Sequence, residues 1–318
     1  MKKTIIQLAV TASIVVNLIL IFLLLAKPAA QNFQKTEDSK SEFFYLSPRI
    51  FMENQNDILI NFTPLREILR LYNQSLKTTV GIYFEYLPSG VSIGINEKEP
   101  FILASLLKVP LVMGMYKQIN LGKLKKSDIL TITEKNLDPS FGTLWEKGAG
   151  TNITVEEAVK LALQKSDNTA TSVLFTNIPS GALSEVFDYL DIPKELESMS
   201  PVVTAKNYSS VLRSLYLSSY LPPQYSNEIL DILTQTEFKE KLPAGVPVGI
   251  KVAHKIGVYE TNNPKDAAYT DCGIVYVPKR PYILCVMVKD KEENASKYIK
   301  DVSSMVYTYV SNSNYPPK

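Results

Sequence analysis

The spacing of apolar residues along this chain alternates between the period of a helix and that of a strand. After Thr63 and Pro64, which predict a capping hydroxyl and a proline in the first turn, apolar side chains recur at helical spacing. Residues 79–87 and 91–96 have strand character, and the Pro-Ser-Gly between them predicts a hairpin. An apolar helix is expected next, ending near Asn120.

The region from residue 123 to 240 has mainly helical periodicity. Thr154 and Glu157 form a capping box at the start of a helix that extends through Lys165. Further helices are expected over residues 168–175, 183–190, 206–217 and 224–236. A helical block of this length predicts an all-helical subdomain over about residues 100–240.

The last part of the chain returns to strand periodicity. Three strands are predicted over residues 248–259, 270–277 and 282–288, and a final amphipathic helix over 293–310. Strands separated by a long helical block indicate an α+β fold. We therefore predict an antiparallel sheet flanked by N- and C-terminal helices on one face, beside the helical subdomain. Functional sites commonly lie in the crevice between two such parts.

The N-terminus has a long apolar segment. Residues 5–26 carry no charge and are long enough to span a bilayer core, and Lys2 and Lys3 favour a cytoplasmic N-terminus. A cleaved signal peptide is the alternative, because residues 27–31 offer small side chains for cleavage. Either interpretation places the rest of the chain outside the cytoplasm. We expect an anchor or signal peptide over 1–27, a polar linker over 28–43 and a catalytic domain over 44–318.

Composition excludes several functional classes. The net charge is +2 and no long basic run is present, so nucleic-acid binding is not expected. The single histidine is His254, and the two cysteines do not form a C-x-x-C motif. We therefore expect no metal site, no cofactor and no Ser-His-Asp triad.

Ser105 and Lys108 are the first candidate catalytic residues along the chain. On a helix, residues three apart share a face, so the hydroxyl and the amine point the same way. A hydroxyl is a poor nucleophile until a base lies beside it, and a desolvated lysine near a second cation can be that base. Two further short motifs follow along the chain, Ser166-Asp167-Asn168 and Lys255-Ile256-Gly257.

In this order, the three motifs resemble the S-x-x-K, S-D-N and K-[TS]-G signature of class A β-lactamases and penicillin-binding proteins. The resemblance covers roughly residues 62–310. It includes residues 101–112, 137–144, 166–170, 243–247, 252–255 and 271–276. It implies the β-lactamase/transpeptidase-like fold and a reaction through an acyl-serine intermediate.

The resemblance also implies a role for each catalytic residue. Ser105 would attack a carbonyl carbon and become acylated, and Lys108 would take its proton. Burial and the nearby charge of Lys255 would both lower the pKa of Lys108 and so prepare it for this role. Ser166 would connect Lys108 to the leaving group.

The substrate-binding residues follow from the same resemblance. Asn168 would hold the substrate amide and the catalytic lysine, and Lys255 would supply positive potential for a substrate carboxylate. The backbone N–H groups of Ser105 and Val258 would form the oxyanion hole. Gly257 has no side chain, so substrate can lie along that strand edge.

Two departures from the family pattern bear on function. Ile256 stands where the family has a threonine or serine that contacts the substrate carboxylate, and Val258 likewise lacks a hydroxyl. The deacylating glutamate of class A β-lactamases, within E-x-x-L-N, is not recognisable, although Glu195 and Glu197 are candidates. We therefore expect β-lactams or D-Ala-D-Ala-like substrates to acylate Ser105, with slow release.

The predicted protein is thus a membrane-anchored, extracytoplasmic serine hydrolase acting on a β-lactam or a peptidoglycan stem peptide. One alternative is a penicillin-binding sensor that is acylated and stops. Another is a degenerate scaffold in which Ile256 marks lost chemistry, but this is opposed by the intact Ser105, Lys108, Ser166, Asn168 and Lys255.

Other chemistry-bearing side chains are assigned structural roles. His254 precedes Lys255 on a predicted strand, so it should point to the opposite face. Cys272 and Cys285 are expected as free buried thiols rather than a disulfide, because the resemblance requires no bridge. Trp145 either lines the mouth of the cleft or packs against its neighbours.

Overall fold

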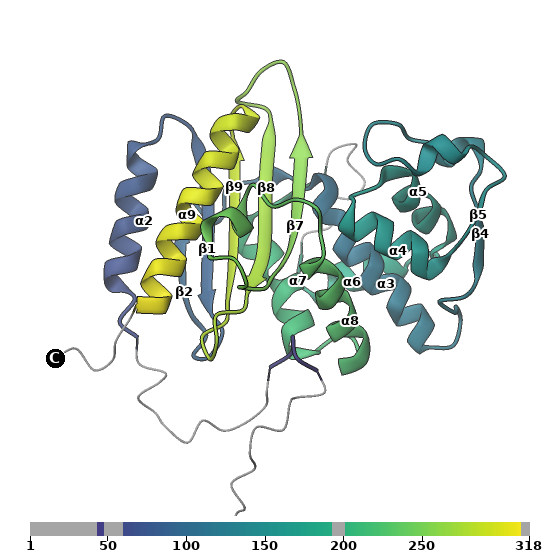
Figure 1. The fold of residues 1–318 in the computed structure, drawn as a ribbon, viewed down its shortest axis with the longest axis horizontal. Coiled ribbons are helices and arrows are strands. Elements are labelled where there is room, and N and C mark those ends of the chain that lie inside the picture. The colour runs from purple at the N-terminus through teal and green to yellow at the C-terminus, as the bar shows by residue number, and fades with distance from the viewer. Residues whose placement is uncertain (1–42, 48–59, 193–200, 313–318) are drawn as a thin grey trace, which may run out of the picture. The chain divides into compact units, whose positions relative to one another are not determined.

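The computed structural model describes residues 43–47, 60–192 and 201–312. A five-stranded antiparallel sheet in the order β2-β1-β9-β8-β7 forms its centre (Figure 1). The strands are β1 (Thr79–Tyr86), β2 (Val91–Ile95), β7 (Val252–Tyr259), β8 (Ala268–Val275) and β9 (Tyr282–Lys289). The order places β7 at one edge, where its outer backbone groups have no partner strand within the sheet.

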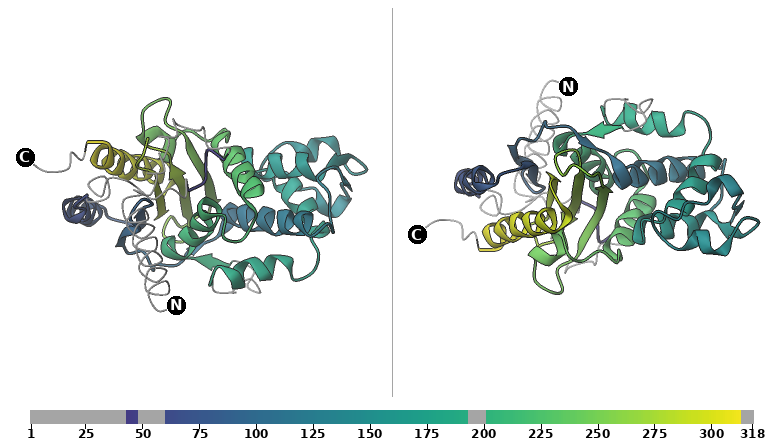
Figure 2. Two further views of the ribbon diagram at one scale, coloured as in Figure 1. Left: turned by 90° about the horizontal axis from the view of Figure 1, so that it is seen from below. Right: turned by 90° about the horizontal axis from the view of Figure 1, so that it is seen from above.

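Two helices from opposite ends of the described chain cover one face of the sheet (Figure 2). They are α2 (Thr63–Ser75) and α9 (Glu292–Asn312). The prediction of Thr63 as the capping residue is wrong, because Phe62 is the N-cap and its side chain makes no capping hydrogen bond. Thr63 is already helical, and its N–H donates to Asn61 Oδ1 at 3.0 Å. Pro64 stays in the first turn, where its missing N–H has no cost.

The helical subdomain lies against the opposite face (Figure 2). Its helices are α3 (Lys108–Asn120), α4 (Val155–Gln164), α5 (Asn168–Asn177), α6 (Ala182–Tyr189), α7 (Ala205–Leu217) and α8 (Pro223–Thr234). The Thr154 capping box is confirmed, because Thr154 Oγ1 accepts from Glu157 N at 3.1 Å and Glu157 Oε2 accepts from Thr154 N at 2.8 Å. Helix α3 is buried along nearly its whole length, so it forms a rigid support for residues at its start.

Two pairs of short strands were not predicted from the sequence. In the first pair, β3 (Phe101–Ile102) is antiparallel to β6 (Val202–Val203). In the second, β4 (Ile129–Thr131) is antiparallel to β5 (Asn152–Thr154). Strands of two or three residues carry no readable period, so only their tertiary partners define them.

Separate apolar cores lie on the two faces of the sheet. One core joins the sheet to the helical subdomain and includes Leu106, Val109 and Cys272. The other joins the sheet to α2 and α9 and includes Leu65, Leu69 and Ile299. Strands β8 and β9 are therefore buried on both faces, which explains the nearly continuous apolar run of β9. The predicted α+β fold is confirmed.

The prediction of free thiols is wrong, since Cys272 and Cys285 form a disulfide. The two residues lie directly opposite each other on β8 and β9. Residues paired in this way point to the same face of a sheet, so both sulfur atoms meet in the core beside the helical subdomain. The sequence placed these cysteines on neighbouring strands, but only the register brings them together.

The predicted membrane segment at residues 5–26 lies outside the described residues. In the part of the chain that the structure does describe, no helix combines the length and the apolar character needed to cross a membrane.

Candidate active site

Ser105 lies on a 3₁₀ turn, η2 (Ala104–Leu107), which leads directly into α3. The expected continuous α-helix therefore begins only at Lys108, whose N–H donates to the carbonyls of Ser105 and Leu106. In a 3₁₀ turn, residues i and i+3 eclipse each other, so a shared face of Ser105 and Lys108 stays a prediction. Ala104 has φ = 44°, a left-handed conformation that is unfavourable for alanine and concentrates at functional sites.

Lys108 is 3% exposed, and its amine has three hydrogen-bond acceptors. Its Nζ donates to the Ser166 carbonyl, to Ser166 Oγ at 3.1 Å and to Asn168 Oδ1 at 2.7 Å. Burial lowers the pKa of Lys108 to about 8, against the opposing charges of Asp167 and Asp138. About a tenth of the amine is therefore neutral at pH 7, compared with almost none at the ordinary lysine pKa, and a neutral amine can accept a proton.

Lys255, on edge strand β7, reaches the same hydroxyl from the other side. Its Nζ donates to Ser166 Oγ at 2.8 Å and to the Ile256 carbonyl at 3.1 Å, and the residue is 1% exposed. Burial, followed by the charge of Lys108, lowers the pKa of Lys255 well below its ordinary value, while Asp271 opposes this. Ser166 Oγ thus accepts from two amines, which uses both of its lone pairs and leaves its own proton to donate to a third group.

Asp167 fixes the second motif between a loop and a helix. Its Oδ1 accepts from Ala170 N at 2.8 Å and so caps α5. Its Oδ2 accepts from the backbone N–H groups of Thr143 and Leu144 at 2.8 and 2.9 Å. Gly142 makes this approach possible, because it has φ = +86° and a Cβ there would meet Asp167 Oδ2 at 2.2 Å. With both oxygens used, the motif is held rigidly.

Sequence reasoning missed a short polar chain that leads from the lysine toward solvent. Asn168 Oδ1 accepts from Lys108, and Asn168 Nδ2 donates to Ser140 Oγ at 2.8 Å. The Ser140 N–H and hydroxyl both donate to Asp138 Oδ1. The signal for it in the sequence is the resemblance of residues 137–144 to the family, which by itself gives these side chains no role in the site.

Strand β7 passes directly against the serine turn. A Cβ on Gly257 would meet Thr270 Oγ1 at 2.5 Å and Leu106 Cγ at 3.2 Å, so only glycine fits at this separation. Hydrogen bonds thus bring Lys108, Ser166, Asn168 and Lys255 to one place, and Gly257 lies against the turn that carries Ser105. The oxyanion hole formed by the N–H groups of Ser105 and Val258 stays a prediction.

The structure also places the other residues considered from the sequence. His254 is fully buried and pairs with Asp271 on the sheet face opposite Lys255, with Nδ1 and Oδ1 2.8 Å apart. Trp145 is 38% exposed. Glu195 and Glu197, the candidates for acyl release, lie outside the described residues.

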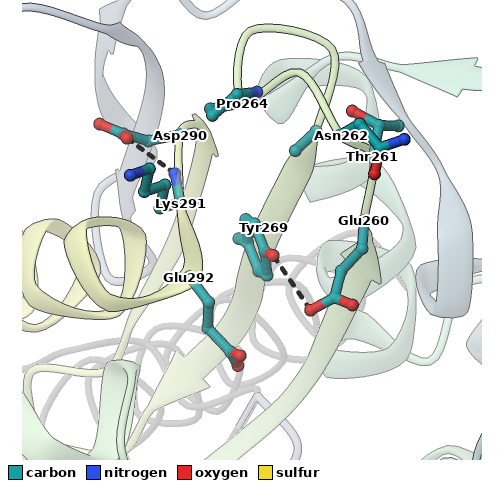
Figure 3. A pocket seen from close by; sticks show the side chains of 9 residues that line it. Glu260, Thr261, Asn262, Pro264, Tyr269, Asp290, Lys291 and Glu292 are labelled. Carbon is teal, nitrogen blue, oxygen red and sulfur yellow. Dashed lines mark hydrogen bonds between the residues drawn. The ribbon is translucent and has the colours of Figure 1, made fainter.

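A cavity of about 350 Å³ lies at the start of α9 and the β7–β8 connection, and it shares no lining residue with the serine–lysine cluster (Figure 3). Its acidic side chains are Glu260, Asp290 and Glu292, and Tyr269 donates to Glu260 at 3.2 Å. Within the described ranges, no group of three or more His, Cys, Asp or Glu side chains is placed to hold a metal ion.

A serine on the turn before a buried helix, a lysine with a lowered pKa and a bridging hydroxyl together form a candidate site for acyl transfer to the serine. The model of the family described as "Beta-lactamase enzyme family" matches residues 64–310. The chain therefore belongs to the β-lactamase enzyme family, within the wider group of β-lactamase-like serine hydrolases.

Individual relatives agree with this assignment. The chain is similar to a β-lactamase of Phocaeicola vulgatus, with 24% identity over 68% of this chain and 76% of the relative. It is also similar to the extended-spectrum β-lactamase PER-1 of Pseudomonas aeruginosa, with 25% identity over 69% and 77%.

Solved structures share the fold. The structure of PBP-A superposes with a TM-score of 0.70 at 24% identity, covering 77% of this chain and 95% of the other. A β-lactamase from Chitinophaga pinensis has a TM-score of 0.70 at 22% identity, covering 77% and 99%. The predicted β-lactamase/transpeptidase-like fold is thereby confirmed.

Proposed function

We propose that this protein is a serine hydrolase that forms an acyl-enzyme at Ser105 with β-lactams or D-Ala-D-Ala-like amides. The observation that carries the proposal is the position of Ser166 Oγ, which lies 3.1 Å from Lys108 Nζ and 2.8 Å from Lys255 Nζ. This hydroxyl connects a lysine with a lowered pKa to the place where a leaving group would form. A serine with a purely structural role would not need a hydrogen bond from either lysine amine.

The first step uses this arrangement for proton transfer. Ser105 Oγ attacks the substrate carbonyl carbon while its proton passes to the neutral Lys108 amine. The carbonyl electrons move to oxygen, where the N–H groups of Ser105 and Val258 would stabilise the negative charge. As the C–N bond breaks, the nitrogen takes a proton from Ser166, which regains one from Lys108.

A peptide substrate would extend along edge strand β7. The sheet order leaves the outer backbone groups of β7 without a partner strand, and Gly257 removes the side chain that would block close approach. An extended peptide can add to such an edge by main-chain hydrogen bonds. The same edge would orient the amide of a β-lactam.

Release of the acyl group is proposed to be slow. The segment 191–203 lacks E-x-x-L-N, so a base for the hydrolytic water is not recognisable in the sequence. Of the structural relatives, a variant of PBP-A is described as an acyl-enzyme complex with penicillin G. A penicillin-binding sensor therefore remains the second candidate, favoured by the same missing base.

We propose an extracytoplasmic location, with residues 1–27 as anchor or signal peptide and 28–43 as linker before the catalytic domain. The uncharged residues 5–26 after Lys2 and Lys3 support this. The Cys272–Cys285 disulfide adds independent support, because disulfides persist in oxidising compartments.

The test is to incubate the purified protein with a chromogenic cephalosporin and follow both turnover and protein mass. A stable adduct that is absent from Ser105→Ala and present in Ser89→Ala, an exposed hairpin serine, supports acylation at Ser105. Steady turnover, lost in the same variant, identifies a β-lactamase instead of a sensor. Neither adduct nor turnover, also with a D-Ala-D-Ala peptide, would overturn the proposal.

A further inference from the structure

The loop over residues 137–143 is fastened to the second motif beside the site. The Asp138 N–H donates to Thr169 Oγ1 at 2.9 Å, and the Phe141 carbonyl accepts from Asn168 N at 3.0 Å. Both contacts are made to the first turn of α5. The loop therefore holds its side chains at a fixed place next to that turn.

The side-chain amide of Asn168 has one hydrogen to spare. Its Oδ1 accepts from Lys108 Nζ at 2.7 Å, and its Nδ2 donates to Ser140 Oγ at 2.8 Å. An NH₂ group has two N–H donors, so one remains for the amide carbonyl that a penicillin or a stem peptide carries on its acyl side. A group attached to that carbonyl would be placed near the loop that carries Ser140 and Asp138.

Asp138 is a carboxylate with lone pairs left for a ligand. Ser140 donates both its N–H, at 2.8 Å, and its hydroxyl to Oδ1, and a carboxylate has further acceptor sites on its second oxygen. Burial raises the pKa of Asp138, but hydrogen bonds from Ser140 and Asn168 and the charge of Lys108 outweigh it, so this pKa lies below its ordinary value.

The charge of Asp138 has no cation of its own. The side chain is half-buried, and none of the ion pairs formed among the described residues includes it. A negative charge thus lies at the end of the hydrogen-bonded chain that runs from Lys108 through Asn168 and Ser140. A cationic group on a substrate would complement it.

We infer that Asp138 is a specificity-determining residue that selects acyl groups with an ammonium on the carbon next to the amide carbonyl. The inference rests on the proposed acylation of Ser105 and names the class of acyl group that is preferred. The ammonium donates to Asp138 while the carbonyl accepts from Asn168 Nδ2. A carboxylate at the same position is repelled by Asp138, and an uncharged group gains nothing from it.

A purely structural role would use the same hydrogen bonds, because Asp138 and Ser140 form an Asx turn. Asp138→Asn separates the two roles, since an asparagine Oδ1 also accepts from Ser140 but carries no charge. Asp128→Asn is the matched control. It removes an identical charge from another loop, where Asp128 Oδ2 accepts from Lys125 N at 2.7 Å.

Three penicillins with the same β-lactam nucleus and phenyl group test the inference. On the carbon next to the side-chain carbonyl, ampicillin has an amine, benzylpenicillin a hydrogen and carbenicillin a carboxylate. The second-order rate constant of Ser105 acylation is measured at pH 7, where an α-amine of ordinary pKa is largely protonated. We expect ampicillin to react about threefold to fivefold faster than benzylpenicillin, and carbenicillin to react most slowly.

Asp138→Asn should bring the three rate constants close together, whereas Asp128→Asn should keep them apart. Thermal unfolding of both variants shows whether the fold is intact before rates are compared. High salt should also reduce the differences in the native protein, because it screens a partly exposed charge pair. This series needs no variant.

Equal rate constants for ampicillin and benzylpenicillin in the native protein would overturn the inference while leaving acylation in place. A preference that persists in folded Asp138→Asn, or that high salt does not reduce, would do the same. If none of the three penicillins gives an adduct that depends on Ser105, acylation by β-lactams fails, and the inference fails with it. The protein mass after reaction distinguishes these failures.

Discussion

Lys108 has an acceptor for each of its three amine donors although it is almost completely buried. The acceptors favour the ammonium form, whereas burial favours the neutral amine, and burial is the larger effect because the pKa is lowered to about 8. The chemistry of Ser105 depends on this balance, since only the neutral amine can take the proton.

The pH dependence of acylation follows from that value. Because the active form is the deprotonated amine, the rate of acyl-enzyme formation should rise with pH and level off above an apparent pKa of about 8. Stopped-flow acylation with a neutral ester between pH 6 and 10 measures this limb. Lys108→Arg keeps the positive charge but stays protonated, so it should be inactive throughout. A flat profile would contradict the role of Lys108 as base.

Gly142 and Gly148 offer a matched pair for the role of Asp167. Both have positive φ, but a Cβ at Gly148 meets nothing within 4 Å, whereas one at Gly142 would meet Asp167 Oδ2 at 2.2 Å. Gly148→Ala should cost about 1–2 kcal/mol from backbone strain alone. Gly142→Ala should cost more and should also slow acylation, because it displaces the carboxylate that holds the Ser166–Asn168 motif.

Urea denaturation of the two alanine variants measures the difference directly. The midpoint should fall further for Gly142→Ala than for Gly148→Ala at the same dependence on urea. Equal losses in both variants would mean that Asp167 adjusts freely and does not hold the loop.

At the scale of elements, an ion pair between a buried glutamate and a partly exposed arginine connects the sheet to the helical subdomain. Glu85 on β1 is 6% exposed, and Arg213 on α7 donates from Nε to its two oxygens at 2.8 and 3.0 Å. Removal of the arginine leaves a buried carboxylate without its main partner. We expect Arg213→Met to lower the free energy of unfolding by about 2–3 kcal/mol.

The double variant Glu85→Met with Arg213→Met should be more stable than Arg213→Met alone, since no buried charge remains. Chemical denaturation of both single variants and of the double variant measures the free energies of unfolding for this double-mutant cycle. Losses that simply add would show that the two side chains act independently.

Element positions were largely predictable from sequence, because each depends on local periodicity. The helix at 206–217 is found as Ala205–Leu217, and the strand at 282–288 as Tyr282–Lys289. The predicted element boundaries are wrong where contacts with neighbouring residues, and not the spacing of apolar residues, set the local structure. The start of the first described helix depends on Asn61 and Phe62, and the turn at Ser105 tightens to 3₁₀ before α3.

At the scale of the whole molecule, the disulfide links two strands that are buried on both faces. It closes a segment with a sequence separation of 13, for which chain entropy predicts about 3 kcal/mol of stabilisation. Cys285→Ala alone should lose most of this, and adding Cys272→Ala should change little more, because the bridge is already absent.

Denaturation midpoints and alkylation test the bridge together. The unfolded, unreduced protein should not react with iodoacetamide until a reductant is added. Immediate alkylation of both cysteines, with independent effects of the two substitutions, would contradict the bond.

The amino-acid sequence by itself determined the α+β class, most helices and strands, and the three motifs that carry the chemistry. These depend on residues close together in the chain. Only the tertiary structure decided that Lys108 and Lys255, 58 and 89 residues from Ser166, meet at one hydroxyl. It also decided that Cys272 pairs with Cys285 and that Phe238 faces Lys255. Strand register and the packing of the helical subdomain on the sheet set these contacts, and neither leaves a local pattern in the sequence.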